Sequence, residues 1–181
     1  MREKLETERL ILRPPQESDA AAMAPLANNL TLTKNTVSMP YPYTLDDARA
    51  FITRSRERRA KGADFPFAIF KKAGMTLIGA VGVHPERNFE LGYWIGEPFW
   101  GQGYATEAAR RVVRFAFEEL NANKIVAGWY HDNPASGRVL EKLGFRHEKE
   151  EERPSMARGQ AATCRMMALT RATFARLEKT P

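Results

Sequence analysis

The stretch of sequence that decides the fold of this chain is Trp100-Gly101-Gln102-Gly103-Tyr104-Ala105. The residues before it, 89–95, alternate in polarity, which predicts a strand. After it, apolar residues recur at the spacing of one buried helical face, at Ala105, Ala108, Ala109, Val112, Val113, Ala116 and Leu120. The pattern therefore predicts a strand, a turn with two glycines, and a long amphipathic helix.

A turn of this kind suits a phosphate group. The first N–H groups of a helix have no partner within the helix, its dipole attracts anions, and glycine lets the backbone approach closely. The alternative is a tight connection that needs glycine only for its backbone angles, and the turn by itself does not separate the two. A P-loop is excluded because the chain has no Gly-Lys pair. A Rossmann fingerprint fits poorly because Thr106 holds the position of its third glycine.

The rest of the chain also alternates strands and helices. Strands are predicted at 9–13, Phe65–Lys71, Thr76–Val83 and Lys124–Tyr130, and near Phe145 and Thr163; helices are predicted after Ser18-Asp19, after Thr44, and at Pro134–Leu143, ended by Gly144. No linker or internal repeat interrupts this order. We therefore expect one domain over residues 1–181.

Composition narrows the classes of protein that fit. The N-terminus has no apolar leader and Cys164 is the only cysteine, so we expect a cytoplasmic protein without disulfides or a membrane partner. A net charge of +6 and a pI near 9.6 suit a polyanionic partner, so a nucleic-acid or ribosome contact stays open. The basic run Arg54–Lys61 fits the solvated face of a helix better than a binding patch. Oligomeric state is undetermined.

Several motifs together resemble one enzyme superfamily. The turn at Trp100–Ala105 is similar to the acetyl-CoA signature of the GNAT N-acetyltransferases, and it is accompanied in the right order by Glu90–Ile95, Asn133–Ser136 and Glu141–Phe145. Trp100 stands where Arg or Gln is usual, as in the branch typified by the RimJ and RimL ribosomal-protein N-acetyltransferases. The resemblance implies an α/β (α+β) GNAT acyl-CoA N-acyltransferase fold. Its sheet is mixed and mostly antiparallel, with about six or seven strands flanked by helices.

The resemblance also implies an acetyl-CoA site and no metal. The pantetheine arm is expected in a gap between strands 89–95 and 124–130, where Gly92 fits a bulge that re-aims backbone groups. The residues implied in cofactor binding are Trp94, Ile95, Gly96, Trp100, Gly101, Gln102, Gly103, Tyr104, Ala105, Thr106, Asn133 and Ser136.

Three residues are candidates for the chemistry. Many members of the superfamily protonate the leaving thiolate with a tyrosine, but Leu140 occupies that position, so the resemblance implies Ser136 with Asn133 instead. Asn133 before a proline is also an ordinary helix cap. Glu90 is the leading candidate for the general base, because strand alternation puts it on the same face as Gly92 and Trp94; the alternative is an exposed strand glutamate. The resemblance places Ser155 where some relatives have a carboxylate, which argues against direct base catalysis.

The sequence indicates less about the acceptor amine than about the acetyl donor. An α-amine with a pKa of about 7.7 to 8.0 is roughly a tenth neutral at pH 7, whereas lysine is well under about a thousandth neutral. We therefore expect direct transfer to an amine such as a protein N-terminus. The alternatives are a small amine (an aminoglycoside, polyamine or amino acid) and a non-catalytic RNA- or ribosome-associating module on the same fold. Tyr41 and Tyr43 could line the acceptor pocket or form a packed lid. His84 and His131 lie at strand ends, where a base, a metal ligand or a loop histidine are all possible, and a loop histidine is favoured because three scattered histidines lack the spacing of a metal site.

Overall fold

One eight-stranded sheet organises the part of the chain that the computed structural model describes, residues 4–179. Met1 to Glu3, part of the N-terminal segment considered above, lie outside it, as do residues 180–181. The strands are β1 (Leu5–Glu6), β2 (Leu10–Arg13), β3 (Phe65–Lys71), β4 (Thr76–His84), β5 (Glu90–Ile95), β6 (Lys124–Tyr130), β7 (Arg146–Ser155) and β8 (Gln160–Thr170). Their order is β1-β2-β3-β4-β5-β6-β8-β7, and every pair except β5–β6 is antiparallel.

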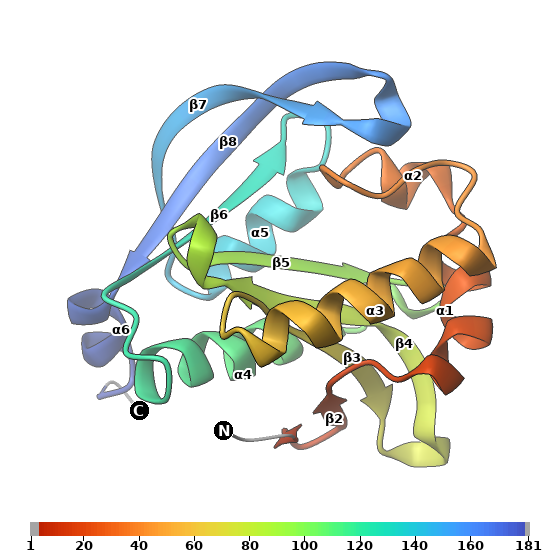
Figure 1. Ribbon diagram of the computed structural model, residues 1–181. Helices are drawn as coiled ribbons and strands as arrows, with labels where there is room; N and C mark the ends of the chain where they lie inside the picture. Colours follow the sequence, from red (N-terminus) through yellow and green to blue (C-terminus); the bar gives the residue numbers. More distant parts are fainter. Residues whose placement is uncertain (1–3, 180–181) are drawn as a thin grey trace.

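The mixed, mostly antiparallel α+β architecture is confirmed (Figure 1). The expected six or seven strands fall short of eight because β1 has only two residues, too few for a periodicity to show. The helices are α1 (Ala20–Ala27), α2 (Leu30–Thr33), α3 (Leu45–Ala60), α4 (Tyr104–Glu118), α5 (Pro134–Lys142) and α6 (Arg171–Leu177). Short 3-10 turns lie at Glu17–Asp19, Ala73–Met75, Pro85–Arg87, Glu97–Phe99 and Met156–Arg158.

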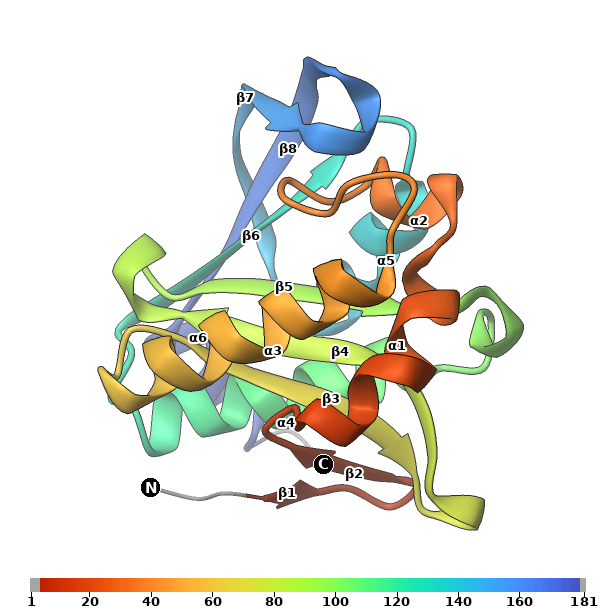
Figure 2. The ribbon, with the colours of Figure 1, turned by 45° about the vertical axis from the view of Figure 1, so that its right-hand side comes forward.

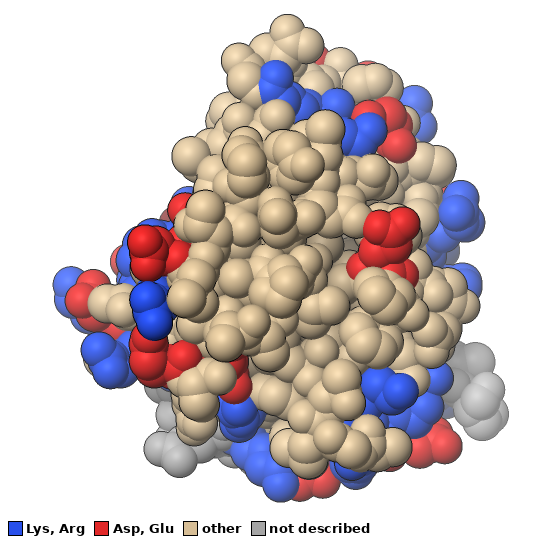
Figure 3. Space-filling model, turned by 90° about the vertical axis from the view of Figure 1, so that its right-hand side faces the viewer, with Lys and Arg blue, Asp and Glu red and all other residues tan. Residues whose placement is uncertain are grey.

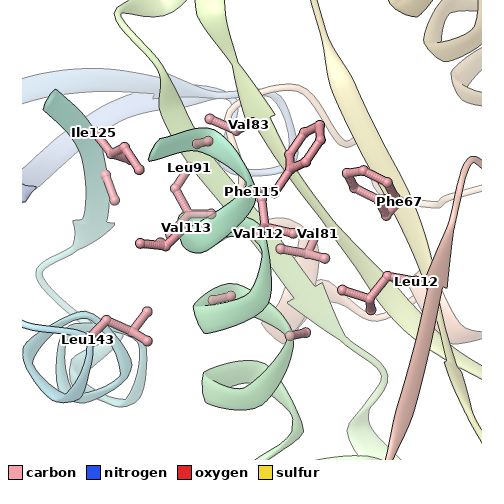
Figure 4. Packing of buried hydrophobic residues seen from close by; sticks show 14 of the residues in the cluster. Leu12, Phe67, Val81, Val83, Leu91, Val112, Val113, Phe115, Ile125 and Leu143 are labelled. Atoms are coloured by element: carbon pink, nitrogen blue, oxygen red, sulfur yellow. The ribbon is translucent and has the colours of Figure 1, made fainter. Parts of the chain in front are cut away.

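Helices cover both faces of the sheet. Figure 2 shows α1 and α3 in front of β3 and β4, with α4 behind them. The apolar face of α4 packs Val112, Val113 and Phe115 against β3, β4 and β5 (Figure 4). Each fully buried side chain of this size stabilises the fold by about 1.5–3 kcal/mol. The smaller cluster beneath α1 and α3 includes Met23 and Ile52.

The strands β5 and β6 form the one parallel pair, and they separate almost at once. Glu90 and Val126 are their only paired residues, although both strands continue for several residues beyond that point. The expected bulge at Gly92 is wrong, because the β4–β5 register runs without a shift from Gly79 to His84. The gap therefore comes from divergence of the two strands.

Three helix N-caps were predicted, at Ser18-Asp19, Thr44 and Asn133, and those at Thr44 and Asn133 are correct. Thr44 caps α3, its hydroxyl accepting a hydrogen bond from the Asp47 N–H at 3.2 Å. Asp19 makes no side-chain cap to α1. Its buried carboxylate instead accepts two 2.7 Å hydrogen bonds from the Arg13 guanidinium. A nearby arginine thus takes the oxygens that the cap would have used.

Candidate active site

A cavity of about 600 Å³ runs along the gap between β5 and β6. At one end it is lined by the glycine turn before α4 and by the first turns of α5. At the other end it is lined by β5, β7 and the segment from Thr31 to Met39. Figure 3 shows the side of the molecule that carries α1 and α2, where most central side chains are uncharged. One continuous space therefore joins the glycine turn to the start of β5.

The glycine turn has the backbone geometry of an anion site. Gly101 and Gly103 have φ angles of +73° and +81°, in the region that favours glycine. Within residues 4–179, the first-turn N–H groups of α4, at Tyr104, Ala105 and Thr106, have no protein acceptor. These donors and the helix dipole suit a pyrophosphate.

Trp100 and Arg9 hold this turn in place. The Trp100 indole Nε1 donates to the Ile95 carbonyl at 2.6 Å, closing the turn on the end of β5. Arg9 donates to the Gln102 carbonyl at 3.0 Å and binds the Glu107 carboxylate in the first turn of α4. The pair with Arg9 offsets a negative charge that would otherwise lie close to a bound phosphate.

Not every residue expected at the cofactor faces the cavity. Trp94 and Ile95 line it, as do Trp100, Gly101, Gly103, Tyr104, Ala105, Thr106, Asn133 and Ser136. Gly96 and Gln102 do not line it. The Gly96 N–H donates to the Ile78 carbonyl at 2.8 Å, so it is already used within the sheet.

Ser136 lies in the first turn of α5 and contacts a tyrosine. Its Oγ is 2.8 Å from the hydroxyl of Tyr93 on β5. Burial raises the pKa of Tyr93 to about 12, so the phenol stays protonated at neutral pH. The Asn133 side chain caps α5 by accepting from the Ser136 N–H at 3.4 Å. Leu140 is buried in the main core, away from any role in proton transfer.

Glu90 is held by an arginine from β7. Arg153 Nη1 donates to Glu90 Oε1 at 2.5 Å and Nη2 to Oε2 at 3.2 Å. Both side chains are more than four-fifths buried. The Glu90 carboxylate raises the pKa of Arg153, which keeps the guanidinium charged. Glu90 is therefore at the predicted place, but both its oxygens are engaged.

The segment after α2 closes the cavity by binding the β7–β8 turn. The hydroxyl of Ser155 donates to the Lys34 carbonyl at 3.1 Å, and Arg158 donates to the same carbonyl at 2.7 Å. Arg158 also donates to Asp132 Oδ1 at 2.7 Å. Ser155 thus holds two segments together.

The remaining polar candidates divide between cavity and surface. Tyr43 is buried and lines the cavity, whereas Tyr41 is exposed and does not. His84 lines it too, with its Nδ1 2.5 Å from Asp64 Oδ1. Among the described residues, no three His, Cys, Asp or Glu side chains are grouped to hold a metal ion. No helix in residues 4–179 is long and apolar enough to cross a membrane.

The family model "Acetyltransferase (GNAT) domain" matches residues 9–146, three quarters of the chain. The chain belongs to the GNAT acetyltransferases. The uncharacterized N-acetyltransferase YoaA of Bacillus subtilis is 32% identical over 148 residues, which are 80% of this chain and 83% of that protein. "Probable N-acetyltransferase YjcK" of the same species is 38% identical over 111 residues, which are 59% of this chain and 61% of that protein.

Solved GNAT structures share the fold. A RimL ribosomal L7/L12 α-N-protein acetyltransferase in complex with coenzyme A has a TM-score of 0.81 at 20% identity, covering 93% of this chain and 98% of that one. A spermidine N-acetyltransferase from Vibrio cholerae, in complex with CoA and spermine, has a TM-score of 0.78 at 20% identity, covering 93% and 99%. At this level of identity the two likenesses show the fold.

Sequence reasoning missed three residues that shape this GNAT site. Arg9, Tyr93 and Arg153 each act across a long sequence separation, on Glu107, Ser136 and Glu90 respectively. One feature of the sequence could have pointed to Tyr93: it lies in the Glu90–Ile95 motif, directly before Trp94 and Ile95, which were assigned to the cofactor. Nothing in the sequence around Arg153 distinguishes it from its charged neighbours.

Proposed function

We propose that this GNAT chain transfers the acetyl group of acetyl-CoA to a primary amine, with a protein N-terminal α-amine as the acceptor. The observation that carries the proposal is the single cavity that joins the glycine turn to Glu90. A ternary complex needs both substrates in one space, and this cavity provides it. Attack is direct, with no acyl-enzyme.

The residues at the glycine end fit acetyl-CoA. The free N–H groups of α4 and the two left-handed glycines suit its pyrophosphate, and Arg138 and Lys142 line the same cavity from α5. A Cβ at Gly101 would meet nothing within 4 Å, so the backbone is open there. When bound, acetyl-CoA supplies the activated thioester.

The proton for the leaving sulfur would come from Ser136. Its hydroxyl lines the cavity, and the protonated Tyr93 phenol holds it. Asn133 fixes the first turn of α5, which sets the direction of that hydroxyl. In this scheme Tyr93 is a positioning residue, because it acts through its contact with the Ser136 hydroxyl.

Cys164 supports direct transfer. It is buried, and burial raises the pKa of its thiol to about 11, which leaves little thiolate at neutral pH. A ping-pong scheme would need that thiolate as the nucleophile. The amine itself is therefore the nucleophile that we propose.

The charges around the cavity favour an α-amine over a polyamine. Among its described lining residues, Glu90 is the only acidic one, and Arg153 already neutralises it. A polycation gains little from a space with one shared carboxylate and several cations. A single ammonium close to Glu90 is easier to accommodate.

A turnover assay tests the proposal. Release of CoA thiol from acetyl-CoA would be followed over N-terminal peptides, amino acids, aminoglycosides and spermidine, with mass spectrometry locating the acetyl group. We expect the best kcat/KM for a peptide N-terminus. Preference for spermidine, the substrate named for the Vibrio cholerae relative, would support the small-amine alternative. RNA binding that weakens with salt, without a thermal shift from acetyl-CoA, would support the non-catalytic one.

A further inference from the structure

The histidine at the end of β4 has the surroundings of a general base. His84 is paired across the β4–β5 ladder with Glu90, so the two residues lie side by side at the acceptor end of the cavity. Its Nδ1 lies 2.5 Å from Asp64 Oδ1, just before β3. The two side chains are 27% and 13% exposed, so the pair is shielded from bulk water without being sealed.

The contact with Asp64 fixes which nitrogen of His84 is available. A carboxylate accepts and does not donate, so this close contact between Nδ1 and Asp64 Oδ1 favours the imidazole proton on Nδ1. The lone pair is then on Nε2. No described residue hydrogen bonds to Nε2, which is therefore free to take a proton.

Gly92 leaves the space in front of Nε2 open. A Cβ built at Gly92 would meet a single neighbour within 4 Å, the His84 Nε2 itself at 3.5 Å. Because the β4–β5 register has no bulge there, the glycine is not needed for a change of strand geometry. Its missing side chain instead lets a substrate atom approach the imidazole.

His84 is better placed for this role than Glu90. Both oxygens of Glu90 already accept hydrogen bonds from Arg153, whereas His84 Nε2 accepts none. An imidazole also changes charge near neutral pH, where a general base is most effective. The charged groups around it are Asp64 before β3, Glu90 on β5, Glu86 and Arg87 in the turn after β4, Arg58 on α3 and Arg153 on β7.

We propose that His84, oriented by Asp64, is the general base of this acetyltransferase, which rests on the proposed function. The amine nitrogen forms a bond to the carbonyl carbon while the carbon–sulfur bond breaks. The ammonium gives one proton to His84 Nε2 before it attacks. The sulfur takes a proton from the Ser136 hydroxyl, and Ser136 regains a proton from the amine nitrogen, which loses its second proton on becoming the amide. Glu90 holds the incoming ammonium, and Asp64 is a positioning residue that stabilises the imidazolium.

The pH dependence of kcat tests the proposal in the full chain. In the wild type we expect kcat to fall on the acid side as the base is protonated. His84→Gln should lower kcat about a hundredfold, abolish that acid limb, and leave KM for acetyl-CoA unchanged. Asp64→Asn should lower kcat about tenfold and move the limb. His131→Gln is the matched control, because His131 is exposed and does not line the cavity.

A second measurement needs no turnover. Long-range proton–nitrogen NMR of the imidazoles reports the tautomer, and we expect neutral His84 to carry its proton on Nδ1 in the wild type and to lose that preference in Asp64→Asn. An Nε2–H tautomer would overturn the proposal, as would a His84→Gln enzyme with the wild-type acid limb. Failure of acetyl-CoA to shift the melting temperature would instead count against the proposed function.

Discussion

At the scale of single residues, the site depends on side chains that hold other side chains. Ser136 and Glu90 were both predicted from the sequence, and both line the cavity. Their partners, Tyr93 and Arg153, were not predicted, because each contact forms between strands or helices that meet only in the folded chain. Residue types can suggest which groups react, but only the packing of β5 against α5 and β7 shows how they are oriented.

Removing the Tyr93 hydroxyl should slow the reaction without weakening cofactor binding. In Tyr93→Phe the Ser136 hydroxyl loses the group that fixes its direction, so kcat should fall about tenfold while KM for acetyl-CoA stays constant. Steady-state kinetics of Tyr93→Phe, Ser136→Ala and the double variant measure this. The double variant should be no slower than Ser136→Ala. Additive losses would show that the two hydroxyls act independently.

Glu90→Gln should separate acceptor binding from proton removal. The amide keeps the shape of the side chain and loses the charge that attracts an ammonium, so KM for the amine should rise about tenfold. The acid limb of the kcat profile should persist, because His84 is unchanged. Loss of that limb in Glu90→Gln, with His84→Gln unaffected, would return the role of base to Glu90. Full activity of Glu90→Gln at every pH would remove Glu90 from the mechanism.

At the scale of helices and strands, the spacing of apolar residues predicted the elements that pack against the core. The strand β6 was predicted over its observed range and α5 to within one residue, because each has one apolar face. The helix α4 begins one residue before its predicted start and ends two residues before Leu120, the last residue of its predicted face. The strand β7 was recognised only near its start. Its sequence, Arg146 to Ser155, is charged on both faces, and its stability comes from pairing with β8. An edge strand of this kind has no hydrophobic pattern to read.

The glycine turn provides a test of the cofactor site. Gly101 and Gly62 both have a positive φ, and a Cβ at either would meet nothing within 4 Å. Alanine at either position should therefore cost about 1 kcal/mol of unfolding free energy. Only Gly101 lines the cavity, so Gly101→Ala alone should raise KM for acetyl-CoA, by about tenfold. Urea titrations and steady-state kinetics measure the two effects, and equal KM values in both variants would argue against a phosphate at this turn.

At the scale of the whole molecule, the acceptor end of the cavity is assembled from segments far apart in the chain. Residues 34–37 contact the β7–β8 turn, and Asp132 after β6 joins them through Lys34 and Arg158. No sequence pattern predicts such a junction, because Lys34, Asp132 and Arg158 each look like an ordinary charged surface residue when considered alone. The expectation of one domain over residues 1–181 stays a prediction.

This junction should make stability depend on pH. Hydrogen bonds from Arg158 and Lys34 lower the pKa of Asp132 from 3.8 to about 2. A carboxyl whose pKa is lower in the folded state stabilises the fold above its unfolded pKa, and that stabilisation is lost as pH falls through the folded pKa. Asp132→Asn should therefore lose about 1 to 2 kcal/mol at pH 7. The difference in unfolding free energy between Asp132→Asn and the wild type should shrink between about pH 4 and pH 2.

Urea unfolding at several pH values measures this difference. Asp46→Asn is the control, because the Asp46 side chain is 90% exposed. A difference that stays constant down to pH 2 would show that Asp132 contributes through its shape rather than its charge.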